Sequence, residues 1–194
     1  MGSFQTPADR AATIMGRNFV GLSELERRFR VRYRPQNGES LQHVNFTEGA
    51  LRAASSTHVL VPGFPLSIVD LQAKFPRLFF KVGWWRDRPF AQRQVELRWY
   101  LVRRLPERSL LSGEYMLPTG EAVYAAILYY LVRGQRLFER VFVLTDDAPL
   151  EEGFRARVLF DRDGLRIHML ASSDTGFGGL GHMLRIASAV RTGR

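Results

Sequence analysis

The chain has 194 residues, of which 45% are apolar, and it carries a formal net charge of +9 at neutral pH. This length and composition fit one globular domain with a sizeable core, and the positive charge favours acidic or polyanionic partners. The sequence holds no cysteine, which excludes disulfides, thiolate catalysis and cysteine-ligated metal centres.

The sequence gives no indication of secretion or membrane insertion. Residues 1–30 contain charged side chains and lack the apolar centre of a secretory signal. The longest apolar run, Ala122–Val132, has eleven residues, whereas a helix that spans a bilayer needs about 20. We therefore expect a soluble, cytoplasmic protein with no membrane partner.

The N-terminal part predicts a flexible tail followed by short helices. Residues 1–15 show little pattern and are expected to form the tail. Ser23 has a side chain suited to capping a helix that runs through Phe29. Thr47 is expected to cap a second short helix, toward Ser55.

A buried strand and a third helix are predicted next. His58–Val61 is a short apolar run, and Pro62 ends it because proline is a poor strand residue. Ser67 is expected to cap a helix over Ile68–Phe75, which Pro76 would end.

The clearest strand pattern lies over Val95–Val102, where apolar and polar residues alternate. This alternation predicts one face packed in the core and one face in solvent, as in many antiparallel sheets. The expected packed face holds Val95, Leu97, Trp99 and Leu101, and the expected solvent face holds Glu96, Arg98 and Tyr100.

The most secure helix is predicted over Glu121–Arg133. Thr119 is a suitable N-cap, and Gly134 is a suitable residue for the left-handed turn that ends a helix. The helix is apolar around its whole circumference between Ala122 and Val132. Such a helix is expected to be buried on nearly all sides, at the centre of the core.

The remainder of the chain predicts strands. Val141–Leu144 follows the helix, and Arg155–Phe160 and Leu165–Leu170 flank a turn that contains an Asp-Gly pair, a strong hairpin signal. A last strand or short helix is expected over Met183–Val190.

Helices early in the chain and strands late, without regular alternation, favour the α+β class. We predict a single domain over residues 16–190, with a C-terminal tail over 191–194. In this fold the buried helix, at about residues 120–133, packs on a largely antiparallel sheet.

Basic and aromatic residues are concentrated between Arg77 and Arg108, which hold nine Lys/Arg against three acidic residues. Guanidinium groups next to aromatic rings are typical of surfaces that bind phosphates and unstacked bases. The predicted nucleic-acid contacts are Trp84, Trp85, Arg86, Arg88, Arg93, Arg98, Arg103 and Arg104.

Two other interpretations of this stretch stay open. The tryptophans can belong to the core while the arginines form a solvated edge that deters strand pairing. Alternatively, the stretch can form a protein interface. Regional charge also favours self-association, because residues 109–154 carry a net −4 beside the basic stretch.

The remaining motifs do not predict a cofactor or a metal. Gly176–Gly181 matches the letters of a dinucleotide-binding loop, but no acidic residue follows it. Turn chemistry explains Asp161 and Asp163, because the later ligands of a calcium loop are absent. A hydrolase site is conceivable among His168, Ser172, Ser173, Asp174 and His182, although no nucleophile motif surrounds either serine.

Several segments resemble an uncharacterised family of bacterial proteins. These segments are Gly16–Phe19, Thr57–Val61, Phe64–Ile68, Gly134–Glu139 and Phe160–Leu165. The resemblance implies one continuous domain and brings no catalytic residue with it.

The sequence as a whole favours a binding protein over an enzyme. The first hypothesis is a non-enzymatic protein with a basic, aromatic surface that binds nucleic acid (DNA or RNA) or another polyanion. The alternatives are a protein-interaction or assembly module and a hydrolase that uses a histidine between residues 168 and 182.

Overall fold

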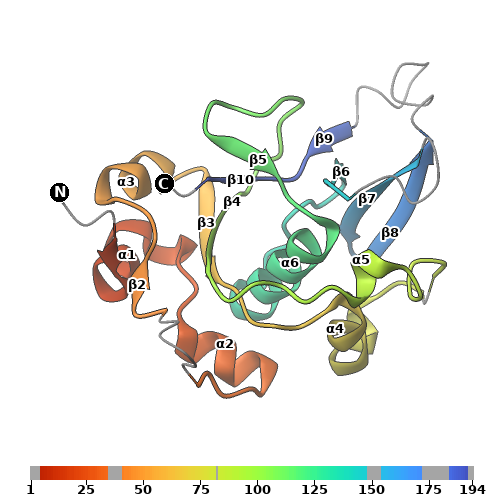
Figure 1. Cartoon of the computed structure of the whole chain (residues 1–194), viewed down its shortest axis with the longest axis horizontal. Coiled ribbons are helices and arrows are strands. Elements are labelled where there is room, and N and C mark those ends of the chain that lie inside the picture. Colours follow the sequence, from red (N-terminus) through yellow and green to blue (C-terminus); the bar gives the residue numbers. More distant parts are fainter. Residues whose placement is uncertain (1–4, 35–40, 82, 148–153, 172–183, 192–194) are drawn as a thin grey trace.

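Helix α6 (Thr119–Arg133) lies at the centre of the molecule and packs against both of its larger sheets (Figure 1). The computed structural model describes residues 5–34, 41–81, 83–147, 154–171 and 184–191. The side chains from Ala122 to Tyr129 are buried, and those from Tyr130 onward are partly exposed. The predicted central helix is therefore confirmed.

The other helices are short and surround the sheets (Figure 1). They are α1 (Ala8–Met15), η1 (Gly16–Asn18), α2 (Leu22–Phe29), α3 (Glu48–Ala54), α4 (Ile68–Lys74), η2 (Pro76–Leu78) and α5 (Pro89–Gln92), where η marks a 3-10 helix.

Two four-stranded sheets and a two-stranded ribbon are formed by the described residues. The ribbon pairs β1 (Thr6–Pro7) with β2 (His43–Val44). The first sheet is antiparallel, in the order β3-β4-β10-β5, and the second has the order β8-β7-β6-β9 with one parallel pair, β6 and β9. Their bounds are β3 (His58–Pro62), β4 (Trp99–Arg103), β5 (Glu114–Met116), β6 (Phe142–Leu144), β7 (Phe154–Asp161), β8 (Gly164–Ala171), β9 (Leu184–Ile186) and β10 (Ser188–Val190).

The predicted strand over Val95–Val102 is wrong in two respects. Strand β4 begins only at Trp99, and all five of its residues are buried. Tyr100 and Val102 face the core around α6, whereas Trp99 and Leu101 face a second apolar cluster on the other side of the sheet. The first sheet therefore has no solvent face along β4.

The predicted flexible tail is also wrong over residues 8–15, and the second apolar cluster explains why. Ala8–Met15 forms helix α1, whose Ala11 and Met15 are buried against the first sheet. The small side chains of this helix give a weak sequence pattern, but they allow close packing. The tail prediction for residues 1–4 and 192–194 lies outside the described residues.

The helix caps follow the sequence in part. Thr47 and Ser67 cap α3 and α4 as predicted, because each side chain accepts a backbone N–H. The cap predicted at Ser23 is wrong, because α2 starts at Leu22 and the Glu24 carboxylate accepts the N–H of Gly21.

The C-terminal end of α6 matches the prediction, whereas its N-terminal end does not. Gly134 ends the helix in the left-handed conformation, with φ of 69°, as predicted. Thr119 is the first helical residue instead of the cap, and its N–H donates to the carboxylate of Asp147, which lies far along the chain.

The hairpin predicted around the Asp-Gly pair is confirmed. Strands β7 and β8 pair along their whole length, from Phe154 opposite Ala171 to Asp161 opposite Gly164. Taken together, the described elements form a single α+β domain whose central helix packs on mostly antiparallel sheets, as the sequence predicted.

Candidate polyanion-binding site

The tryptophans predicted as base contacts mostly belong to the core. Trp85 is 2% exposed and packs against Phe79, with ring centroids 5.9 Å apart. Trp84 is half-buried beside Phe90. The buried ring of Trp85 therefore offers no free surface on which a base could stack.

Arg98 is held by partners within the protein. Its guanidinium lies 4.8 Å from the ring centroid of Tyr100 and forms ion pairs with Glu96, at 3.2 Å, and Glu121, at 3.4 Å. The Tyr115 hydroxyl also donates to Glu121, at 3.4 Å. Burial raises the pKa of the Glu121 carboxyl, although the Arg98 charge opposes the shift.

Arg103 is buried, with its side chain 9% exposed. Its Nη2 and Nε atoms donate to Oε1 of Glu114, at 2.6 and 2.8 Å. Burial alone would raise the pKa of the Glu114 carboxyl, but the N–H of Leu111 and the Arg103 guanidinium outweigh burial and lower it. Arg103 is therefore part of a buried ion pair and does not reach solvent with its charged group.

The other predicted arginines are spread over separate places. Arg104 is half-buried and donates to the side chain of Asn18, at 3.1 Å. Arg86 and Arg93 are exposed on either side of α5, and Arg88 is half-buried there. The structure thus brings Arg86, Arg88 and Arg93 into one neighbourhood and leaves Arg103 and Arg104 at the far end of β4.

A second group of arginines, which the sequence analysis did not single out, lies at the end of α2. These residues form the arginine rim: Arg27, Arg28, Arg30, Arg32 and Arg34. All five are exposed. Five arginines in eight residues is a higher density than in the stretch Arg77–Arg108, so local charge density was the signal that could have found them.

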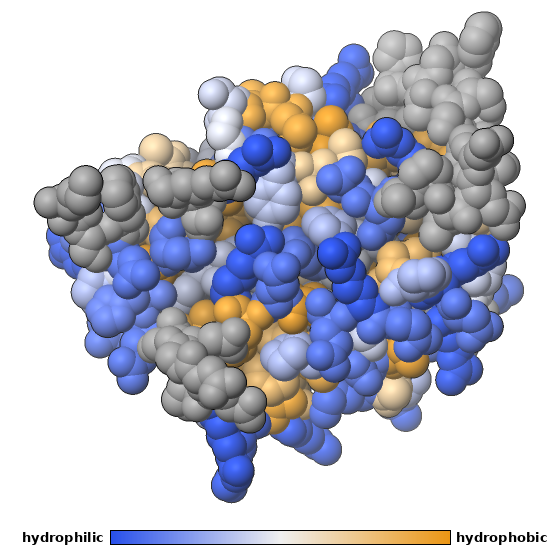
Figure 2. All heavy atoms as spheres, viewed as in Figure 1, coloured by the Kyte–Doolittle hydropathy of each residue, from blue (hydrophilic) through white to orange (hydrophobic). Residues whose placement is uncertain are grey.

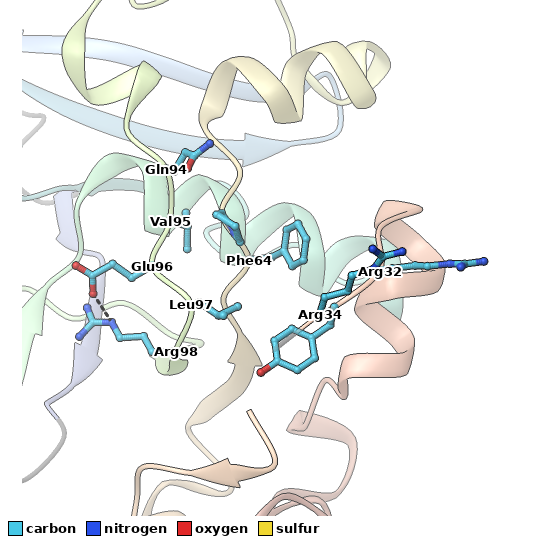
Figure 3. Close-up of a pocket in the computed structure, with 10 residues that line it drawn as sticks. Arg32, Arg34, Phe64, Gln94, Val95, Glu96, Leu97 and Arg98 are labelled. Carbon is cyan, nitrogen blue, oxygen red and sulfur yellow. Dashed lines mark ion pairs between the residues drawn. The ribbon is translucent and has the colours of Figure 1, made fainter. Parts of the chain in front are cut away.

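The arginine rim ends at a hollow of about 650 Å³, which we call the aromatic hollow. Three segments line it: Arg32–Arg34, Phe64–Pro65 and Gln94–Arg98. Phe64 lies between Val95 and Leu97 on one side and the two arginines on the other (Figure 3). Hydrophilic side chains cover most of the face seen in Figure 2, with smaller apolar areas between them.

Backbone hydrogen bonds fix the floor of the aromatic hollow. The N–H of Gly63 donates to the carbonyl of Arg98, at 2.7 Å, and the N–H of Val95 donates to the carbonyl of Leu66, at 3.2 Å. A Cβ atom at position 63 would lie 2.1 Å from the carbonyl oxygen of Glu96. Only glycine allows the two segments to approach this closely.

A smaller, acidic hollow of about 180 Å³ lies on the other side of segment 94–98. Its walls hold four carboxylates and two guanidinium groups: Glu96, Glu121, Asp146, Asp147, Arg93 and Arg98. Tyr100 donates to Glu121 there, at 3.2 Å, and burial raises the pKa of the Tyr100 hydroxyl. Arg98 donates to the Tyr115 hydroxyl and to Glu121, which ties segment 94–98 to β5 and α6 and holds one wall of the aromatic hollow in place.

The predicted histidine site is described only in part. His168 is half-buried on β8, opposite Arg157, and its ring contacts Phe142. Burial, together with the charges of Arg157 and Arg166, lowers its pKa. Ser172, Ser173, Asp174, His182 and the loop Gly176–Gly181 lie outside the described residues.

Metal-binding clusters and membrane-spanning helices are both absent from the described residues. No group of three or more His, Cys, Asp or Glu side chains among them is placed to hold a metal ion. No helix in the same part of the chain is long and apolar enough to cross a membrane.

Comparisons of the chain with protein-family models, with curated proteins and with solved structures found no match. The resemblance to bacterial proteins therefore remains an expectation from the sequence.

Proposed function

We propose that this protein binds a polyanion, with nucleic acid as the first candidate, through the arginine rim and the aromatic hollow. The observation that carries this proposal is the exposure of Arg32 and Arg34 at the edge of a hollow that also contains Tyr33 and Phe64. Arg32 and Arg34 have no ion-pair partner among the residues that the structure describes. Both side chains are exposed, and guanidinium groups bind phosphate oxygens in a bidentate manner.

The location of this proposed site differs from the one predicted from sequence alone. Arg98 and Arg103 have carboxylate partners inside the protein, so the proposal does not use them as phosphate contacts. Arg86, Arg88 and Arg93 lie around α5, and Arg93 lines the acidic hollow on the other side of segment 94–98, so the proposal does not rest on them. The net charge of +9 supports the same class of partner.

The test is a salt series of gel shifts and fluorescence anisotropy with single- and double-stranded DNA and RNA. Binding is expected to weaken steeply with salt, because displaced counterions drive it. The double variant Arg32→Ala/Arg34→Ala should weaken binding and lower the slope of log K against log salt by about 0.7 per lost contact with a single strand.

A charge-matched control is available in Arg10 and Arg52. Both are exposed, and both form ion pairs with Glu48 at a distance of 3.1 to 3.2 Å. The variant Arg10→Ala/Arg52→Ala removes the same net charge elsewhere and should keep nearly all of the affinity. Equal losses in the two double variants, or the absence of any shift at low salt, would remove the proposal.

One observation favours the second candidate function, a protein-interaction module. The loop between β4 and β5 projects from the molecule (Figure 1). Leu105 and Leu111 are 71% and 52% exposed on this loop. If self-association uses these leucines, sedimentation velocity should show a dimer that Leu105→Ser/Leu111→Ser converts to a monomer, with little dependence on salt.

A further inference from the structure

We propose that the aromatic hollow holds an unstacked base of a single-stranded nucleic acid, with Phe64 as the ring on which the base stacks. This inference rests on the proposed function and specifies its ligand. It distinguishes a single strand from a duplex and from polyanions that have no bases.

The size and lining of the aromatic hollow fit such a ligand. Its volume of about 650 Å³ lies within the range of about 300–1,000 Å³ that is usual for small-molecule pockets. Apolar side chains of Val95 and Leu97 lie beside Phe64, whereas Arg32 and Arg34 lie at the other side (Figure 3). This arrangement offers an apolar platform for a base and cations for the phosphates next to it.

The stacking ring is held in place before any ligand arrives. Phe64 is half-buried and its side chain packs against the core around α6, while its carbonyl accepts the N–H of Leu66, at 2.7 Å. Tyr33 is fixed in a similar way, because its N–H donates to Glu26, at 2.6 Å, and its hydroxyl accepts the N–H of Leu41, at 3.0 Å. Pre-formed rings lose little conformational freedom on binding, which favours affinity.

The charges around the aromatic hollow also favour a base flanked by phosphates. Among the described residues that line the hollow, Glu96 is the only carboxylate, and its ion pair with Arg98 points away from Phe64 (Figure 3). The other described lining residues are apolar, neutral and polar, or positively charged. A cationic ligand would be repelled there, whereas a nucleotide would meet complementary charge.

A duplex cannot use the aromatic hollow in this way. Its bases are already stacked and paired, so it presents only its phosphate backbone to the arginine rim. A single strand can turn one base into the hollow and keep the same phosphate contacts. We therefore expect tighter binding of single strands than of duplexes with an equal number of phosphates.

The experiment measures anisotropy with three labelled probes of equal phosphate count: an oligothymidylate, the same backbone without bases, and a duplex. The full chain is compared with Phe64→Ala and with the control Phe80→Ala. Phe80 is a suitable control because it is an exposed phenylalanine that also lies beside basic groups, Lys81 and Arg166, and does not line the aromatic hollow.

Phe64→Ala is expected to weaken binding of the oligothymidylate about tenfold and to leave binding of the base-free backbone unchanged. Phe80→Ala should leave both unchanged. If Phe64→Ala does not fold, as judged by circular dichroism, Phe64→Leu retains the apolar contact and removes the ring, and the same selective loss is expected.

The outcomes separate this inference from the proposed function. Equal affinity for the oligothymidylate and the base-free backbone, or equal effects of the changes at positions 64 and 80, would overturn the inference while polyanion binding stands. Absence of binding to all three probes at low salt would instead overturn the proposed function.

Discussion

His58 and Arg103 lie opposite each other on strands β3 and β4, and both reach the same oxygen of Glu114. The Nε2 atom of His58 lies 3.3 Å from Oε1 of Glu114, and Nδ1 lies 2.8 Å from the hydroxyl of Thr57. All three charged or titratable side chains are buried. Burial and the Arg103 charge lower the pKa of His58, although Glu114 opposes the shift.

The first prediction is a loss of stability on mild acidification. His58 has a lower pKa in the folded chain than its ordinary value of 6.5, so below about pH 6.5 the unfolded chain binds a proton that the folded chain does not. Its contribution to stability is complete above pH 6.5 and is lost as the pH falls through the folded pKa. Urea unfolding between pH 7.5 and pH 5 measures this slope.

The matched variants are His58→Gln and His43→Gln. His58→Gln should flatten the slope, whereas His43→Gln, on the surface, should keep it. The flattening will be partial, because His168 also has a lowered pKa. An unchanged slope in His58→Gln would show that the buried imidazole does not contribute.

The second prediction concerns the buried ion pair between Arg103 and Glu114. Arg103→Met leaves the Glu114 carboxylate buried without its guanidinium partner, which should cost about 3–5 kcal/mol of unfolding free energy. The double variant Arg103→Met/Glu114→Met removes both charges and should be more stable than Arg103→Met alone. The single variant Glu114→Met completes the double-mutant cycle, and additive losses of the two single variants would contradict the ion pair.

The third prediction compares two glycines. Gly63→Ala should destabilise the fold by about 1–3 kcal/mol or more, because the alanine Cβ atom would lie 2.1 Å from the carbonyl oxygen of Glu96. Gly49→Ala in helix α3 meets nothing closer than 3.9 Å and should stabilise by up to about 1 kcal/mol. Thermal unfolding of the two variants checks both signs.

The fourth prediction assigns Trp85 to the core. Trp85→Ala should cost about 3–5 kcal/mol of unfolding free energy, because it empties a fully buried site. Nucleic-acid affinity, measured under conditions in which the variant stays folded, should be unchanged. A stable Trp85→Ala protein with weakened binding would instead support the contact predicted from the sequence.

The elements that could be predicted from the sequence are those whose pattern is local. Helix α6 has a continuous apolar run and ends at Gly134, and the hairpin of β7 and β8 has its own turn signal. The burial of β4 on both faces could not be predicted, because one covering element is α1. The pattern of α1 is weak, and its contact with the sheet is long-range.

The candidate site was harder to predict for a similar reason. The sequence predicts Leu97 on the packed face of a strand and does not single out Phe64, and only the fold places the two beside Arg32. The sequence also could not show which arginines of the stretch Arg77–Arg108 are exposed and which are paired inside the protein. Whether Arg103 meets solvent or Glu114 depends on the pairing of strands that are distant in the chain.

The aromatic hollow is assembled from three segments that lie far apart in the chain, so it exists only when the chain is folded. Any compound that occupies it therefore binds the native state and not the unfolded one. Thermodynamic linkage then requires each such compound to raise the melting temperature, and at 100 times its Kd it adds about 2.7 kcal/mol to the unfolding free energy. A thermal-shift screen of nucleotides can thus find binders of the native state without an assay for the protein's activity, and those that occupy the hollow should lose their shift in Phe64→Ala.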